Sequence, residues 1–200
     1  VEESNYTVVL IQAANEEDHG VYRIDSRESI VYNYERNYQD PAATQQFTLE
    51  VDPLCGEVKK ACTVFLSRRD VPTPSSRIYP EQLQLKATAI SNQYINTDQQ
   101  SDYRYRGLSY DQQEFQLINL SIGSGQYFSY AEISRQATEA FENVVPYMAT
   151  PSGIPDAPYA TQTNWSTSFF WNEDQSAVLP AGQVSSRALL HHLSQQVYTK

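Results

Sequence analysis

The sequence has little of the chemistry that the commonest hydrolase and metal sites need. It contains two cysteines, three histidines and one methionine among 200 residues. His19 lies in an acidic turn, and His191 and His192 are adjacent, so none of them forms a recognisable pair with a nucleophile. The motifs GxSxG and HExxH do not occur. These absences argue against a Ser/His hydrolase and against a zinc enzyme.

Long apolar runs and an excess of basic residues are also missing. No apolar run approaches the roughly 20 residues that a membrane-spanning helix needs. The net charge is −10, with 14 Lys and Arg against 24 Asp and Glu. Nucleic acids and anionic membranes both reward a basic surface. The sequence therefore predicts no membrane span and no nucleic-acid partner.

The remaining composition is typical of an exported globular protein. Hydrophobic residues make up 40% of the chain and charged residues 19%, which is enough apolar material for a sizeable core. Tyrosine is abundant, with 15 residues, and the chain opens at Val1 rather than Met, as expected after a leader is removed. We expect a secreted, periplasmic or extracellular protein with a single domain over 1–200. Within it, the sequence suggests a β-rich unit at 1–70, a Pro/Ser linker at 71–80 and an α+β unit at 81–200.

The two cysteines, Cys55 and Cys62, lie close together in the segment CGEVKKAC. No other Cys or His is near enough to complete a metal site. Gly56 and the polar residues after it would allow the chain to turn back. This spacing predicts a disulfide that closes a small loop in an oxidising compartment, and two free thiols are the alternative.

Hydrophobic periodicity predicts an α+β fold, with an antiparallel sheet core and two or three helices. Residues 6–12 (YTVVLIQ) are β-branched and apolar, which indicates a buried strand. Further strands are expected at 21–24, 28–34, 47–51, 62–66, 103–108, 115–122, 144–148, 166–171 and 177–179. Helical spacing of apolar residues predicts helices at 81–96, 130–143 and 185–198. For the first of these, a strand through LQLKATAI is the competing interpretation.

The stretch from Gly125 to Val145 joins an aromatic segment to the strongest predicted helix. Two other segments lie to either side of it in the sequence, YRYRGLS at 103–109 and DQSAVLPAG at 174–182. This order is the one pattern in the chain that suggests a reaction.

Four short motifs together resemble mono-ADP-ribosyltransferase toxins. The segment VYRIDSR at 21–27 is similar to the first-strand motif of the cholera and pertussis type, (V/L)YR-x-DSR. The segment YRGL at 105–108 resembles the YRG strand of the other large branch. The segment YFS at 127–129, followed by a helix, resembles the aromatic–Ser-Thr-Ser motif. The segment QSAVLPAG at 175–182 resembles the Gln/Glu-x-Glu motif and its following strand.

The resemblance implies a secreted toxin subunit that binds NAD and acts on a protein target or assembles with other toxin subunits. Arg23 or Arg106 would hold the pyrophosphate, because the planar guanidinium fork matches phosphate. Ser129 would shape the nicotinamide pocket. Gln175 and position 177 would supply the catalytic segment, whose carboxylate stabilises the oxocarbenium-like transition state.

The sequence departs from this family at several positions. Ala177 stands where the catalytic Glu is expected, so the chain would be either an inactive relative or an engineered one. Ser129 is followed by Tyr130 and Ala131 rather than by Thr and Ser. If Arg23 is the NAD arginine, the segment FLS at 65–67 is an alternative serine motif.

Two other interpretations remain open from the sequence. The site residues could be structural, with both arginines on strand edges, Ser129 as a helix N-cap and Gln175 in an exposed turn. The protein could also be a non-enzymatic exported module that binds a partner through its aromatic surface. Four residues near the C-terminus would contribute to that surface: Trp165, Phe169, Phe170 and Trp171.

Overall fold

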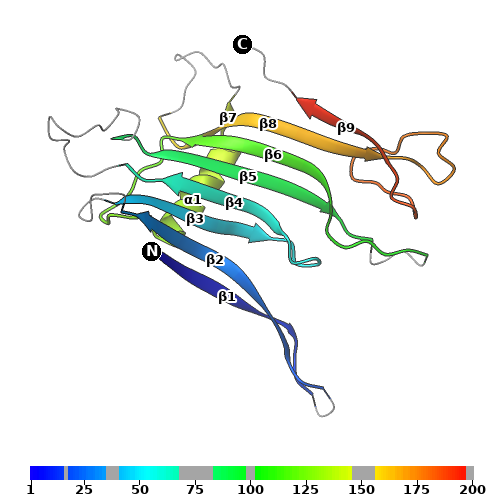
Figure 1. Cartoon of the computed structure of the whole chain (residues 1–200), viewed down its shortest axis with the longest axis horizontal. Coiled ribbons are helices and arrows are strands. Elements are labelled where there is room, and N and C mark those ends of the chain that lie inside the picture. The colour runs from blue at the N-terminus through cyan, green and yellow to red at the C-terminus, as the bar shows by residue number, and fades with distance from the viewer. Residues whose placement is uncertain (16–17, 35–40, 68–82, 98–101, 146–155, 197–200) are drawn as a thin grey trace.

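A wide, twisted antiparallel sheet forms the body of the chain, and one helix lies across it (Figure 1). The computed structural model describes residues 1–15, 18–34, 41–67, 83–97, 102–145 and 156–196. Strand accounts for 54% of the chain and helix for 9%. The predicted linker at 71–80 lies outside the described residues.

The strands follow one another in the sheet almost in chain order. The order is β1-β2-β3-β4-β5-β6-β8-β7, and β9 pairs with the remaining part of the outer edge of β8. All pairings are antiparallel except the short parallel contact between β7 and β8. The strands are β1 Glu2–Gln12, β2 Val21–Asn33, β3 Ala42–Val51, β4 Val58–Phe65, β5 Lys86–Ile95, β6 Leu108–Ile118, β7 Val144–Val145, β8 Tyr159–Phe170 and β9 Leu190–Gln196.

The main core lies between the sheet and helix α1 (Tyr130–Glu142). Four apolar residues are directly opposite one another on adjacent strands and form a buried row beneath the helix: Phe47, Cys62, Ala89 and Phe115. The helix buries Ile133, Ala137 and Ala140 against this side of the sheet, at the spacing of one helical face.

The other side of the same strands is polar. Directly opposite residues there form the row Gln46, Thr63, Thr88, Gln116 and Thr161. An antiparallel sheet with one covered side and one polar side gives this alternation along each strand.

A second, smaller core holds the loop after β8 against the far end of the sheet, where β5 ends and β6 begins. Ile95, Phe170 and Val184 are buried there, and Tyr103 and Tyr105 pack against them. The Tyr103 hydroxyl donates to the Val184 carbonyl at 2.9 Å, and the Tyr105 hydroxyl donates to the Ser186 carbonyl at 2.6 Å.

The α+β prediction with two or three helices is wrong, because α1 is the one helix named within the described residues. The predicted helix at 81–96 is largely strand β5, in which Ala87 and Ala89 are buried at strand spacing. The predicted helix at 185–198 contains strand β9, whose seven residues are all exposed. In both segments, pairing with neighbouring strands overrides an apolar spacing that also suits a helix.

Candidate functional site

Arg23 is neutralised by a carboxylate of its own strand. Its Nε donates to Asp25 Oδ1 at 2.8 Å, and its Nη2 donates to Asp25 Oδ2 at 3.1 Å. The side chain also lies against Gly56 in the turn between β3 and β4, where an added Cβ would come within 3.2 Å of Arg23 Cδ. In this bidentate pairing, the Arg23 N–H groups that could bind a phosphate donate to the Asp25 carboxylate instead.

Arg106 lies in a bend immediately before β6, with its side chain exposed. The bend is fixed by Gly107, which has a φ of +70° and donates its backbone N–H to Asn96 Oδ1 at 3.0 Å. A Cβ at Gly107 would come within 3.3 Å of Cys55 Cβ. The predicted strand at 103–108 is therefore mostly irregular chain that ends in this bend, and β6 begins at its last residue, Leu108.

Ser129 is the N-cap of α1. Its Oγ accepts from the backbone N–H of Glu132 at 3.3 Å, and the Glu132 carboxylate accepts from the Ser129 backbone N–H at 2.9 Å. The hydrogen bonds from Ser129, side chain first and then backbone, lower the pKa of Glu132. In this reciprocal capping box, the backbone N–H and the Oγ of Ser129 both form hydrogen bonds with Glu132, within the first turn of the helix.

Gln175 and Ala177 lie in a tight exposed turn after β8. Gln175 has a φ of 59°, in the left-handed region. The backbone N–H of Ala177 donates to Asn172 Oδ1 at 3.1 Å, and the Asn172 N–H donates to the Ala177 carbonyl at 2.9 Å. A longer side chain at position 177 would therefore project into solvent from an exposed turn.

These residues do not meet at one place. The residue before Ser129, Phe128, exchanges two hydrogen bonds of 3.0 Å with Gln45 in the middle part of β3. Arg23 lies instead beside the turn beyond Val51, roughly 20 Å along the strand at ~3.3 Å per residue. The strand of Arg23, β2, and the strand before Ala177, β8, are five positions apart in the sheet, which is about 24 Å.

Two of the predicted segments are nevertheless neighbours. The YRYRG segment packs through Tyr103 and Tyr105 on the loop that follows residue 182. These contacts are a small core and two tyrosine hydrogen bonds to backbone carbonyls. The proximity of YRYRG to the loop after residue 182 therefore reflects packing at one end of the sheet.

The predicted disulfide is absent, and both Cys55 and Cys62 are free thiols. Cys55 lies in the turn between β3 and β4, whereas Cys62 is buried in β4, four residues past its start at Val58. That length of strand covers about 13 Å, while a disulfide needs Cα atoms within about 7 Å of each other. Burial raises the pKa of the Cys62 thiol to about 12.

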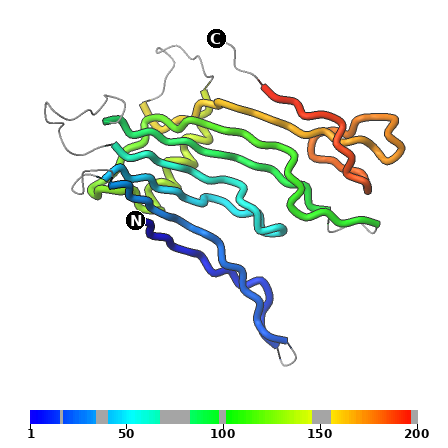
Figure 2. Tube along the Cα trace, in the orientation of Figure 1, coloured from blue at the N-terminus to red at the C-terminus, as the bar shows by residue number. Residues whose placement is uncertain are grey.

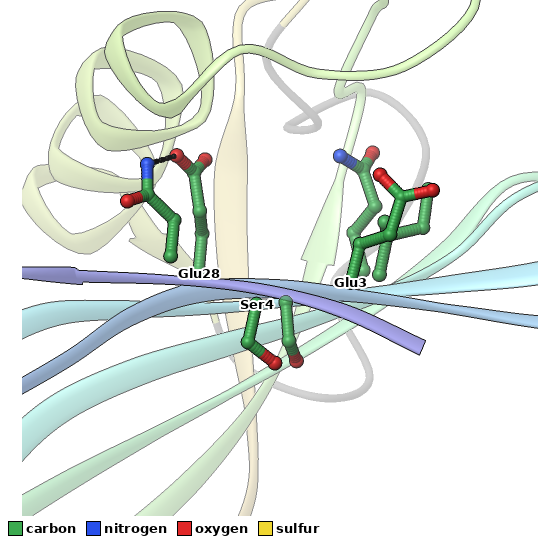
Figure 3. Close-up of a pocket in the computed structure, with 7 residues that line it drawn as sticks. Glu3, Ser4 and Glu28 are labelled. Atoms are coloured by element: carbon green, nitrogen blue, oxygen red, sulfur yellow. Dashed lines mark hydrogen bonds between the residues drawn. The ribbon is translucent and has the colours of Figure 1, made fainter. Parts of the chain in front are cut away.

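A small polar pocket lies between strands β1, β2 and β3 (Figure 3). Glu3 and Glu28 point to the same side of the sheet, and Ser4 points to the other. Asn5 Nδ2 donates to Glu28 Oε1 at 3.1 Å. The pocket volume of about 230 Å³ is below the usual range for small-molecule sites. Within the described ranges, no three His, Cys, Asp or Glu side chains are grouped to hold a metal ion.

The four aromatic residues predicted near the C-terminus do not all lie on one surface, although Trp165 and Phe169 line the same pocket against β9. Phe170 is buried in the second core. Trp165 is on the surface, and its indole N–H donates to the buried Asp111 carboxylate at 2.7 Å. Phe169 stacks on His192 with ring centroids 4.7 Å apart, and Trp171 meets His191 edge-on at 4.3 Å.

One exposed apolar surface among the described residues was not predicted from the sequence. Residues 6–12 were expected to form a buried strand, but this part of β1 is mostly exposed. Val8 lies opposite Ile24, and Leu10 lies opposite Tyr22, so their side chains share one side of the β1–β2 hairpin. We call this surface, formed by Tyr6, Val8, Leu10, Tyr22 and Ile24, the hairpin face. An apolar run in a sequence predicts that its side chains are buried, but it does not show whether residues 1–200 or another polypeptide segment buries them.

Comparison with protein-family models gives a match over residues 1–122, to the family described as the insecticide toxin TcdB middle/C-terminal region. A search of curated proteins finds no match. No helix of the described residues is long and apolar enough to cross a membrane.

Solved structures share the fold along almost the whole chain. One is described as TcdB2-TccC3 without its hypervariable C-terminal region, with 18% identity and a TM-score of 0.71 over 99% of this chain. Another is a Tc holotoxin pore of Photorhabdus luminescens that carries a TccC3 point mutation, with 19% identity and a TM-score of 0.63 over 97% of this chain. The chain spans 9% of the length of each of these solved chains.

These findings correct the resemblance to mono-ADP-ribosyltransferase toxins, which is wrong. The short motifs that carried it lie in strand β2, in the bend before β6, at the N-cap of α1 and in the turn after β8, within a fold shared with a Tc toxin structure. NAD binding, which rested on that resemblance, stays a prediction. Because the family match covers more than half of the sequence, the chain belongs to the insecticide toxin TcdB middle/C-terminal region family.

Proposed function

We propose that this chain is a non-enzymatic β-sheet unit of a secreted insecticidal toxin, and that it joins neighbouring parts of the toxin through its exposed surfaces. The observation that carries this proposal is the hairpin face in a member of a toxin family. Contiguous exposed apolar side chains of this kind mark interaction surfaces.

The polar residues support a structural role. Arg23 is paired with Asp25, and Ser129 caps α1. Catalysis needs a reacting group, its activating partner and a charge stabiliser within a few ångströms of one another. The residues that sequence motifs suggested for these roles are distributed over both ends of the sheet.

The solved relatives supply the proposed partner. One is described as TcdB2-TccC3 and the other as a Tc holotoxin. We therefore propose that the toxin containing this chain assembles with a TccC-type subunit outside the producing cell. In this assembly the chain contributes a rigid sheet, whose main core beneath α1 is its own.

The test uses the complete toxin polypeptide and four substitutions. Val64→Asp places a carboxylate in the core, whereas Thr63→Asp changes the adjacent residue on the polar side of the same strand. Co-purification with the TccC-type subunit should be lost for the first and retained for the second.

Arg106→Ala and Gln175→Asn should leave both assembly and toxicity within a few-fold of the parent, and Asn tolerates the left-handed backbone at 175. Loss of toxicity with normal assembly in either variant would show that these residues carry out a reaction, and would refute the structural role.

A further inference from the structure

The hairpin face is an apolar surface that the described residues leave uncovered. Its five side chains are between 54% and 68% exposed. The pairs Val8–Ile24 and Leu10–Tyr22 are directly opposite across the two strands, and Tyr6 continues the same row. The row is therefore a continuous apolar strip rather than a set of isolated residues.

The strip lies on the side of the sheet away from α1. Arg27 packs over the Tyr130 ring of the helix, with its guanidinium carbon 4.2 Å from the ring centroid. Asp25 and Arg23 alternate with Ser26 and Ile24 along β2, so they share the helix side with Arg27. The outer part of the hairpin also diverges from β3, with which β2 pairs only from Glu28 onward, and it projects away from the sheet, as Figure 2 shows. Neither the helix nor the main core can reach the strip.

The outer strand lacks the charges and prolines that usually protect an edge strand against pairing. Strand β1 is at the edge of the sheet, and it has no charged residue and no proline between Ser4 and Gln12. Exposed edge strands in soluble proteins normally carry charges, prolines or bulges that prevent association. The two register shifts of this pairing, between Asn5 and Tyr6 and between Leu10 and Gln12, lie at the two ends of the apolar strip and do not interrupt it. These features are typical of an edge strand that another protein surface covers.

Charge argues against a second copy as the cover. The chain carries a net charge of −10, so two copies meeting face to face would repel each other. Acidic residues also border the strip, with Glu2 at the start of β1 and Asp18 in the hairpin turn. An anionic lipid surface would be repelled in the same way.

Length favours a cover from the same polypeptide. The chain corresponds to 9% of the solved toxin chains, so most of such a polypeptide lies outside it. A tethered partner has an effective concentration in the millimolar range, and a modest apolar strip is then enough for stable docking.

We propose that the hairpin face docks against an apolar β-strand surface with neutral or basic borders, contributed by the same toxin polypeptide outside residues 1–200. This inference rests on the proposed function and names the partner of the surface. Docking would bury the five apolar side chains and would leave the opposite side of β1 accessible.

Cysteine labelling of the complete toxin polypeptide, before the TccC-type subunit is added, tests this proposal. Ile24→Cys reports on the hairpin face, and Val8→Cys repeats the measurement on the other strand. Thr7→Cys is the matched control, because Thr7 is exposed on the opposite side of β1. Labelling is followed by mass spectrometry of the peptides that contain each position.

We expect the thiols at 24 and 8 to be labelled about tenfold or more slowly than the thiol at 7, because only local opening would expose them. The difference should persist when the polypeptide is diluted a hundredfold. Equal labelling at the three positions would overturn the proposal. So would protection that disappears on dilution, which indicates a second copy, or protection that requires phosphatidylcholine vesicles.

The proposed function and this inference can fail separately. Protection that appears only after the TccC-type subunit is added would identify that subunit as the cover and would overturn the inference, while the structural role would stand. Loss of toxicity in Arg106→Ala with normal assembly would overturn the structural role and would leave the labelling pattern unchanged.

Discussion

Replacing Asp111 with Ala should destabilise the far end of the sheet through three hydrogen bonds. Asp111 is buried in β6, and its Oδ2 accepts from the Trp165 indole at 2.7 Å and from the Thr167 hydroxyl at 2.8 Å. Its Oδ1 accepts from the Gln113 amide at 2.9 Å. The carboxylate therefore ties β6 to β8 next to the exposed Trp165.

The magnitude depends on which donors can reach water after the substitution. Thr167 is only 8% exposed, so its hydroxyl would remain without a partner at a cost of about 1–3 kcal/mol. Trp165 is 40% exposed and Gln113 is half-buried, so water can replace much of what they lose. We expect a decrease in the free energy of unfolding of about 2–4 kcal/mol, offset in part because the buried charge no longer has to be desolvated.

Urea unfolding followed by tryptophan fluorescence measures this change. The protein has two tryptophans, so Trp171→Phe leaves Trp165 as the only reporter. Gln112→Ala, adjacent in β6 and exposed on the polar side, should change stability by no more than about 0.5 kcal/mol. A decrease below about 1 kcal/mol for Asp111→Ala, or equal effects of the two substitutions, would refute the assigned role of the carboxylate.

Three further measurements test the core, the helix cap and the thiols. Ile133→Ala removes a fully buried side chain from α1 and should lower the free energy of unfolding by about 2–5 kcal/mol, measured by urea unfolding. The folded state depresses the pKa of Glu132 below its ordinary 4.5, so its contribution to stability is present above that value and is lost as pH falls through the folded pKa. Glu132→Gln should therefore reduce the loss of stability below pH 4.5 in acid unfolding, and an unchanged acid profile would contradict the capping box. Cys62 should resist a thiol reagent at pH 8 until the protein is denatured, because burial raises its pKa to about 12, whereas the half-buried Cys55 should react in the native state.

Helix α1 was predictable because its signals are local. Ser129 and Glu132 have the spacing of a capping box, and apolar residues recur at helical spacing through Phe141. The structure confirms the predicted helix at 130–143 within one residue. Strand β3 was equally accessible, since FTLEV alternates and Phe47 faces the core.

The errors arise where pairing between distant segments decides the outcome. Leu83, Ala87, Ile90 and Tyr94 fit one face of a helix, but the last three lie in β5 between β4 and β6. The short motifs at 21–27 and 175–182 give no information about distance, and the separation of five sheet positions from β2 to β8 appears only in the structure. A candidate site assembled from short motifs is therefore less secure than a helix assembled from neighbouring residues.

The hairpin face follows from the same physics as the buried core. Val8 and Ile24 are β-branched, as is Val64 in the core strand β4, and each apolar side chain gains about 1.5–3 kcal/mol when it is buried. In β4 this gain is realised beneath α1, which the chain itself provides. At the hairpin the matching surface must come from elsewhere, because α1 lies on the opposite side of the sheet. A sheet with its own core and an uncovered apolar edge can fold first and then dock, which is the behaviour that the proposed role in a larger toxin requires.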